Sequence, residues 1–213
     1  MAKFNEMSEL LQKGKAPQLI EMIKGELDAG VTAGDILNEA LIPGINVIGE
    51  RFKKNEVFIP EVLICARAMN MALDLLKPLL LSTGVEPVGK AIICTVQGDL
   101  HDIGKNLVKI MMEGNGIECV DLGVDVKPEQ VVEAIKANPD AKLVCLSSLL
   151  TTTMVNQGAI IEAIKAAGLR DQVKVMVGGA PVTTAYAESI GADAYTDDAA
   201  SAALKATELL KSF

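Results

Sequence analysis

The sequence predicts a chain of two parts, an all-α helical bundle followed by an α/β domain with a five-stranded parallel sheet. Over residues 1–88 the apolar residues recur with the spacing of one face of a helix. Over residues 89–213 short, β-rich apolar runs alternate with helical segments at intervals of about 25 residues. The chain of 213 residues is 50% hydrophobic, enough to bury a core in one ordinary domain or in a medium domain with a small one.

The first two helices are expected over residues 4–11 and 16–28. Both segments are amphipathic, and Gly30 ends the second of them. The next helix begins after Thr32, whose hydroxyl is a suitable N-cap. This helix meets Pro43, where we expect a kink rather than two unrelated elements, because proline removes one helical hydrogen bond.

The fourth helix is expected from about residue 60 to residue 77, ending before Pro78. Its apolar residues cover most of its circumference. Such a pattern is typical of a helix at the centre of a bundle, or of one whose outer face is covered by something else.

Five strands and five helices are expected to alternate in the second part. This alternation predicts a doubly wound parallel sheet with helices on both faces. Five strands favour the flavodoxin-like (Rossmann-like) order 2-1-3-4-5, in which ligands bind beyond the carboxyl ends of strands 1, 3 and 4. The strands are expected over residues 91–96, 117–122, 143–146, 173–177 and 192–195, and the helices over residues 104–114, 128–137, 157–167, 183–189 and a last segment ending near residue 210.

Charge and cysteine content exclude several functions. The net charge is −8 and no basic block is present, so binding to nucleic acid is not expected. The N-terminus carries charges where a signal peptide needs an apolar core, and no apolar run reaches the roughly 18 residues of a membrane span. We therefore expect a soluble, cytoplasmic protein without membrane contact.

The four cysteines form no Cys-x-x-Cys pair and are expected to be buried hydrophobic residues.

His101 is the only histidine. This count excludes metal sites with two histidines and leaves at most one catalytic triad. The chain also lacks the glycine motifs of dinucleotide sites and phosphate-binding loops, and it has no G-x-S-x-G elbow. Ser147 stands where a phospho-receiver domain would have its acceptor aspartate.

Three strand ends are expected to meet at one edge of the sheet. A loop with Asp99 and His101 follows the first strand, a hydroxyl-rich stretch follows the third, and a Gly-Gly pair follows the fourth. An aspartate two residues before a histidine can bind one imidazole nitrogen and leave the other free for a metal. Because no other ligands cluster nearby, the metal would have to bring most of its own, as in a macrocycle. For this loop alone, a purely structural Asp–His hydrogen bond remains an equal alternative.

Together, the motifs resemble the signature of cobalamin-binding domains that hold the corrinoid base-off with histidine on cobalt. They are Asp99-x-His101-x-x-Gly104, Ser147-x-Leu149 and Gly178-Gly179, in this order. The segment GERFKKNEVFIPEVLICARAMNMALDLLKP, residues 49–78, resembles the helical cap of small corrinoid proteins from methyltransferase systems and of the cobalamin module of methionine synthase. The resemblance implies a helical cap domain over residues 1–88 and a cobalamin-binding domain over residues 89–213.

The resemblance implies a role for each motif residue. His101 would be the lower axial ligand of cobalt, Asp99 would bind its other nitrogen, and Thr153 would continue this chain. A proton shared along these three catalytic side chains would bias cobalt between its states. The remaining cofactor-binding residues would be Asp102, Ile103 and Gly104 near the corrin, Ser147, Leu149 and Thr151 along the slot for the nucleotide tail, and Gly178 and Gly179 beside its ring.

The resemblance further implies a methyl carrier that alternates between cobalt(I) and methylcobalamin, which contains methyl-cobalt(III). Such a protein is not catalytic alone. It would take the methyl group from a substrate:corrinoid methyltransferase and deliver it to a corrinoid:acceptor methyltransferase that uses tetrahydrofolate or a thiol coenzyme, with a reductive activator as a further partner. The alternatives are the cobalamin-binding subunit of an adenosylcobalamin-dependent mutase, a cobalamin sensor module, and a flavodoxin-like binding protein without a corrinoid.

Overall fold

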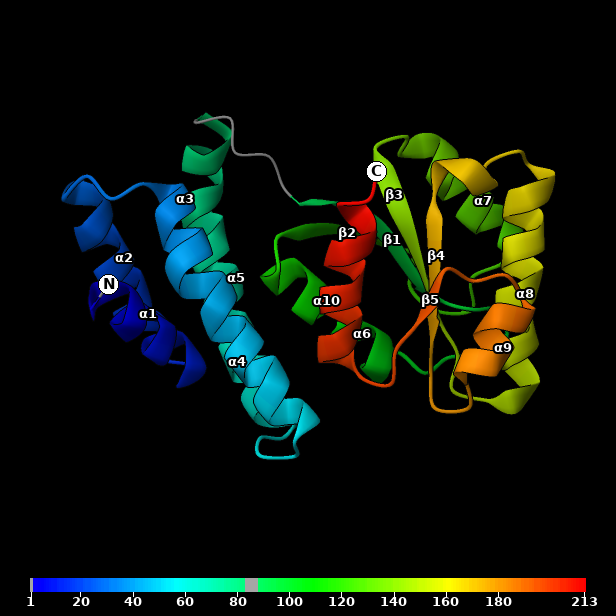
Figure 1. Cartoon of the computed structure of the whole chain (residues 1–213), viewed down its shortest axis with the longest axis horizontal. Coiled ribbons are helices and arrows are strands. Elements are labelled where there is room, and N and C mark those ends of the chain that lie inside the picture. Colours follow the sequence, from blue (N-terminus) through cyan, green and yellow to red (C-terminus); the bar gives the residue numbers. More distant parts are fainter. Residues whose placement is uncertain (1, 83–87) are drawn as a thin grey trace. The chain divides into compact units, whose positions relative to one another are not determined.

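The structure is a computed structural model that describes residues 2–82 and 88–213, and it divides into a helical unit and an α/β unit (Figure 1). The helical unit holds α1 (Ala2–Gln12), α2 (Ala16–Asp28), α3 (Ala33–Ile36), the π-helical turn η1 (Leu37–Leu41), α4 (Ile42–Lys53) and α5 (Ile59–Ser82). Large apolar side chains from all four expected helical segments are fully buried, among them Met7, Leu19, Ile45 and Leu76. The helical first part is thus confirmed.

One helical segment runs through Pro43, as the sequence predicts. It begins after Thr32, whose Oγ1 accepts a hydrogen bond from Asp35 N at 3.0 Å. Directly before Pro43 the backbone makes the wider turn η1. Pro43 has no N–H to offer to the carbonyl of Glu39 four residues earlier, so the irregular turn lies where the α-helical pattern loses a hydrogen bond.

The expected end of the fourth helix is wrong, because α5 continues through Pro78 to Ser82. Leu76 and Leu80, one turn apart on either side of this proline, are both buried, so the apolar stripe continues past it and keeps the chain helical. The apolar circumference of α5 is divided in two. Val62 and Met69 are buried, while the exposed group includes Leu63, Ile64 and Met71.

The α/β unit has a parallel sheet of order β2-β1-β3-β4-β5, which confirms the predicted order. In Figure 1, α6 and α10 cover one face of the sheet, and α7, α8 and α9 cover the other. The strands are β1 (Gly89–Thr95), β2 (Ile117–Asp121), β3 (Ala141–Ser147), β4 (Lys174–Gly178) and β5 (Ala194–Tyr195). The helices are α6 (Ile103–Gly114), α7 (Pro128–Ala137), α8 (Thr151–Ala166), the 3-10 turn η2 (Arg170–Gln172), α9 (Thr184–Ser189) and α10 (Ala199–Leu210).

Most elements of this unit begin or end one or two residues from the expected bounds, while α8 differs by more and β5 is half its expected length. Helix α8 begins six residues earlier than predicted, at Thr151, although its first turn consists of threonines, which are weak helix formers. Strand β5 has only two residues. Asp193, just before it, bonds to β4 through both main chain and side chain, and its N–H donates to Val175 O at 2.7 Å. Its carboxylate accepts a hydrogen bond from Val175 N at 2.7 Å and pairs with Arg170.

The four cysteines form no disulfide, and Cys65, Cys94 and Cys145 are buried, as expected. The expectation of burial is wrong for Cys119, which is half-buried. Burial raises the pKa of the Cys94 thiol to about 12, so this thiol is protonated and unreactive at neutral pH. Within residues 2–82 and 88–213, no helix combines the length and the apolar character that a membrane crossing requires.

Candidate functional site

The ends of β1, β3 and β4 lie side by side. Ser147 pairs with Thr95 of β1 and with Gly178 of β4, so the loops that follow these three strands leave the sheet at one edge. Gln157 of α8 ties two of these ends together, because its amide nitrogen donates to Leu146 O and Gly178 O, both at 3.0 Å. The expected meeting of three loops is confirmed.

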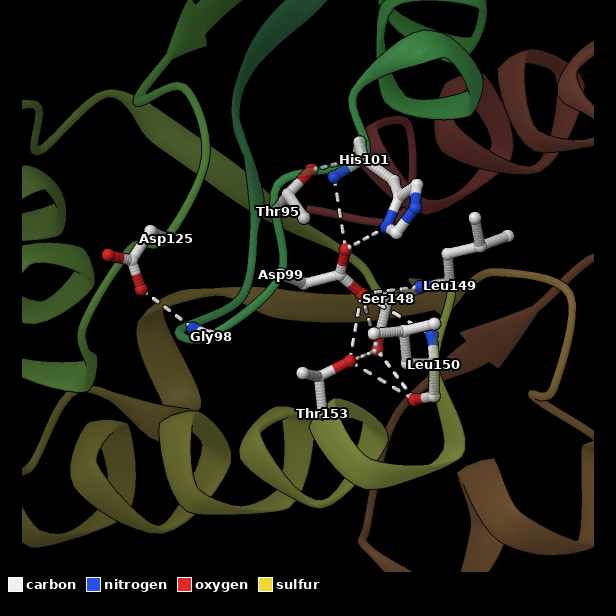
Figure 2. Close-up of polar contacts among 9 residues, drawn as sticks. All are labelled: Thr95, Gly98, Asp99, His101, Asp125, Ser148, Leu149, Leu150 and Thr153. Atoms are coloured by element: carbon white, nitrogen blue, oxygen red, sulfur yellow. Dashed lines mark hydrogen bonds and ion pairs between the residues drawn. The ribbon is translucent and has the colours of Figure 1, made fainter.

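Asp99 and His101 form the centre of this edge (Figure 2). The carboxylate oxygen Oδ1 of Asp99 lies 2.7 Å from His101 Nδ1 and accepts a second hydrogen bond from His101 N at 3.0 Å. The Asp99 side chain is fully buried, whereas that of His101 is 52% exposed. An ionised carboxylate can only accept, so Nδ1 carries a proton, and in the neutral imidazole Nε2 then has the free lone pair.

The second carboxylate oxygen of Asp99 binds the chain after β3. Oδ2 accepts hydrogen bonds from Leu149 N at 2.7 Å and from Thr153 Oγ1 at 2.8 Å. Burial raises the pKa of Asp99, but the hydrogen bonds from His101, Leu149 and Thr153 outweigh burial and hold this pKa well below its usual range. Asp99 is therefore a buried anion that fixes the imidazole at Nδ1, the nitrogen opposite the free Nε2.

Two hydroxyls complete the network. Ser148 Oγ lies 2.8 Å from Thr153 Oγ1 and 3.3 Å from Asp99 Oδ2. A threonine hydroxyl has one proton, so when Thr153 donates to Asp99, Ser148 is the donor to Thr153. Sequence reasoning selected Ser147 and missed Ser148. With two adjacent serines at a strand end, only the register of the strand decides which one faces Asp99.

Exposed apolar side chains occur in the chain segments that follow β1 and β3 and carry the site. Ile103 is 70% exposed and Leu149 is 43% exposed, and both were predicted site residues. Their sequence neighbours Leu100 and Leu150, which were not among the predicted site residues, are also exposed. Exposed leucine and isoleucine in the same loops as one nitrogen donor suit a flat, largely apolar ligand.

The predicted residues at the start of α6 have different surroundings. The Asp102 carboxylate accepts a hydrogen bond from Asn106 Nδ2 at 3.0 Å. Gly104 faces open space, with no atom within 4 Å of where a Cβ would stand. Thr151 is exposed in the first turn of α8.

The two glycines after β4 are not equivalent. Gly178 faces open space, whereas a Cβ on Gly179 would lie 1.7 Å from Ser148 O. Gly179 also has a φ of +129°, a conformation that residues with a side chain rarely adopt. Gly179 is therefore required by the close approach of two backbones, and Gly178 leaves room at the edge of the site.

The described residues contain no group of three histidine, cysteine or acidic side chains that could hold a bare metal ion. His101 Nε2 is therefore the one imidazole donor offered to a metal by residues 2–82 and 88–213, and the other ligands of such a metal would have to come with it.

Comparisons with known proteins cover both parts of the chain. Two family profiles, each described as a B12 binding domain, match residues 89–205 and residues 3–77. The chain is 40% identical over 195 residues to monomethylamine corrinoid protein 2 of Methanosarcina acetivorans, covering 90% of both proteins. It is 41% identical over 192 residues to dimethylamine corrinoid protein 1 of the same organism, covering 90% of this chain and 88% of that one.

A solved structure is also similar over nearly the whole length. The crystal structure of a cobalamin-binding protein from Desulfitobacterium hafniense DCB-2 aligns with a TM-score of 0.82 and 29% identity. The alignment covers 97% of this chain and 98% of that chain.

Proposed function

This chain belongs to the family of corrinoid proteins with B12 binding domains, and from this membership we propose that it carries a methyl group between two methyltransferases. A corrinoid is its cofactor, so the alternative of a flavodoxin-like binding protein without a corrinoid is wrong. The observation that carries the proposal is the 2.7 Å hydrogen bond between Asp99 and His101, which leaves Nε2 free at an exposed edge.

The residues of the site fit a corrinoid. A corrin ring supplies four nitrogen ligands to cobalt, so one imidazole from the protein is sufficient. The exposed apolar side chains beside His101 suit the face of a macrocycle, and Gly104 and Gly178 leave open space next to it. Bound there, the corrinoid supplies the cobalt on which the methyl group is carried.

In this proposal His101 binds cobalt through Nε2 in the base-off, His-on arrangement. Asp99 holds the Nδ1–H form of the ring and makes Nε2 a stronger donor, because a buried carboxylate stabilises positive charge on the imidazole. Thr153 and Ser148 keep the carboxylate in place from the other side. Movement of a proton along this chain would adjust how strongly His101 holds the metal.

The remaining predicted residues are assigned to the cofactor's periphery. We propose that Ser147, Leu149 and Thr151 line the slot for the nucleotide tail and that Gly178 and Gly179 border its ring. Asp102 and Ile103 would lie near the corrin. Residues 1–88 would form the cap that shields the methyl-bearing face, and residues 89–213 the domain that binds the cofactor.

The proposed partners are a substrate:corrinoid methyltransferase, a corrinoid:acceptor methyltransferase using tetrahydrofolate or a thiol coenzyme, and a reductive activator. The two relatives named for monomethylamine and dimethylamine are equally similar to this chain, so identity does not select a donor between them. We propose that the donor methyltransferase selects the substrate. A donor panel should therefore start with methylated amines and include methanol, methoxylated aromatics and glycine betaine.

The single histidine permits a decisive test of the axial ligand. The full chain is reconstituted with hydroxocobalamin, reduced to the cobalt(II) state, and studied by electron paramagnetic resonance. An axial ¹⁴N splits the signal into triplets, and uniform ¹⁵N labelling of the protein alone should convert these into doublets. Because His101 is the only histidine, this conversion identifies it. Triplets that persist in the labelled protein would show that the cofactor's own base is still bound and would reject the His-on proposal.

A second experiment tests methyl transfer. The reduced, reconstituted protein is mixed with candidate donor methyltransferases and each donor of the panel, and formation of the methylcobalamin absorption spectrum is followed. Methylation with at least one pair, followed by loss of the methyl group to an acceptor, supports the carrier role. Binding of adenosylcobalamin with activity only alongside a mutase subunit would favour the mutase alternative, and a light- or cobalamin-dependent change of assembly would favour the sensor.

A further inference from the structure

We infer that Asn156 and Asp125 are positioning residues that hold the peptide group between Gln97 and Gly98 from two sides and thereby set the orientation of Asp99 and His101. The inference rests on the proposed role of His101 as the axial ligand. It adds two residues that lie outside all three sequence motifs and reach the site from separate elements.

Both hydrogen bonds act on the same peptide group. Asn156 Nδ2, from α8, donates to Gln97 O at 2.7 Å. Gly98 N donates to Asp125 Oδ1, from the loop after β2, also at 2.7 Å. If this peptide flipped, its carbonyl would face the Asp125 carboxylate and its N–H would face the Asn156 amide donor, so both contacts favour one orientation.

The backbone conformations of Gly98 and Asp125 are consistent with this fixed orientation of the peptide group. Gly98 has a φ of +81°, and Asp125 is a non-glycine residue with a φ of +55°. The left-handed region is unfavourable for residues with a Cβ, and aspartate is among the few that adopt it with modest cost. Such a residue persists where its surroundings fix it, and it is found more often at functional sites.

Asp125 also holds Asp99 directly. Its backbone N–H donates to Asp99 O at 3.0 Å, so the main chain of Asp99 is fixed one residue beyond the clamped peptide. On the far side of Asp99, Thr95 Oγ1 donates to His101 O at 3.0 Å. The backbone from Gln97 to His101 is thus fixed at successive points, while the Asp99 carboxylate fixes the imidazole (Figure 2).

The chemistry of an axial ligand needs this precision. A metal-binding group must be held within about 0.5 Å of its working position by supporting contacts, and loops do not supply such precision without them. Because Gln97, Gly98 and Asp125 are all exposed, these hydrogen bonds contribute little to global stability. Positioning and folding can therefore be separated by experiment.

The test uses three substitutions at Asp125. Asp125→Asn keeps both the acceptor oxygen and a residue that tolerates positive φ, Asp125→Gly keeps the conformation but removes the acceptor, and Asp125→Ala removes both. Asn156→Ala removes the other contact. Its matched control is Asn138→Ala, which also removes an amide-to-backbone hydrogen bond, to Ala134 O at 2.9 Å, at the end of α7.

The first readout needs no cofactor. His101 gives the only imidazole ring signals in ¹⁵N–¹H NMR spectra of the full chain, and these report whether Nδ1 or Nε2 carries the proton. Asn156→Ala and Asp125→Gly should move the ring signals toward a mixture of the two forms, while Asp125→Asn and Asn138→Ala should match the wild type. Unchanged ring signals in the first two variants, or an equal change in Asn138→Ala, would overturn the inference.

The second readout is the cobalt(II) resonance of the ¹⁵N-labelled, reconstituted protein. Asn156→Ala and Asp125→Gly should show a reduced fraction of the histidine doublet and about tenfold weaker cobalamin binding, the lower end of the effect expected for residues that orient a ligand. Full doublet intensity and wild-type affinity would reject the inference. If His101→Ala itself kept the wild-type resonance, the proposed function would fail, while the cofactor-free NMR comparison would still decide the positioning role.

Discussion

The hydroxyl Oγ1 of Thr153 lies 2.8 Å from Asp99 Oδ2, although the two residues are 54 positions apart in the sequence. Through this contact, the first turn of α8 is joined to the loop after β1. The contact is buried at both ends, so it contributes to stability as well as to the site.

Thr153→Val should therefore lower the free energy of unfolding by about 2 kcal/mol, the contribution of a hydrogen bond to a charged group. The substitution keeps the shape and removes the donor to Asp99. Thr153→Ser keeps the hydroxyl and should lose less. Urea unfolding of both variants at neutral pH measures the difference, and equal stability of Thr153→Val and Thr153→Ser would show that the hydroxyl contributes nothing.

Ser148→Ala should destabilise the protein by about 1 kcal/mol, because Thr153 loses its buried hydrogen-bond donor. Ser147→Ala is the matched control, since the adjacent serine does not contact Asp99. Its stability should stay near that of the wild type. Chemical unfolding of the pair distinguishes the two serines, and a larger loss for Ser147→Ala would reverse the assignment made from the structure.

Asp121→Asn should cost about 3 kcal/mol, because it leaves a buried lysine charge without its partner. Lys105 Nζ lies 2.7 Å from Asp121, and the Lys105 side chain is only 2% exposed. The control is Asp140→Asn, which removes the more exposed ion pair with Lys90 and should have a much smaller effect. Equal losses in both variants would contradict the role assigned to burial.

The effect of Asp121 should depend on pH. Burial raises the pKa of Asp121, but hydrogen bonds from Lys105 and Gly123 N outweigh it, so this pKa is lowered. The ionised Asp121 carboxylate stabilises the folded protein fully at pH values above its pKa in the unfolded chain, about 3.9. This contribution is lost as the pH falls through the lower pKa that Asp121 has in the folded protein. The stability difference between wild type and Asp121→Asn should thus shrink between pH 6 and pH 3, and a constant difference would exclude the charge as its cause.

Gly179→Ala should unfold the protein or destabilise it by more than about 3 kcal/mol, since the new Cβ meets the Ser148 backbone. Gly178→Ala should fold with nearly unchanged stability, because its Cβ enters open space. If the nucleotide tail occupies that space, Gly178→Ala should nevertheless weaken cobalamin binding. Thermal unfolding and a cobalamin titration on the same samples separate the two effects, and unimpaired binding by Gly178→Ala would remove this glycine from the proposed slot.

Part of the site could be predicted because parallel strands bring distant loops to one edge. The predicted order of the strands placed the loop with Asp99 and His101 next to the hydroxyl-rich stretch after the third strand. The choice of Thr153 within that stretch came from the resemblance to cobalamin-binding domains. No comparable rule of strand order points to Asp125 and Asn156, which the sequence did not single out. Asp125 and Asn156 reach the loop from 27 and 59 positions away, and an isolated aspartate or asparagine gives no signal in a single sequence.

The fold was predictable where local pattern and packing agree. The bounds of α2 and α7 are those expected from their periodicity and their flanking residues. Local rules failed at Pro78, where a continuing apolar stripe keeps α5 helical, and at Thr151, where buried Thr153 and Gln157 secure a threonine-rich helix start. In both places tertiary contacts outweigh the preferences of single residues.

The short β5 has a consequence for how other proteins can bind. Strand β5 forms one edge of the sheet and pairs through only Ala194 and Tyr195, so this edge offers almost no backbone for a further strand. A strand added there from a second copy or from another protein would gain few main-chain hydrogen bonds. The short edge strand therefore protects the α/β unit against edge-to-edge aggregation. Partners that approach this side of the α/β unit must instead recognise side chains and loop ends.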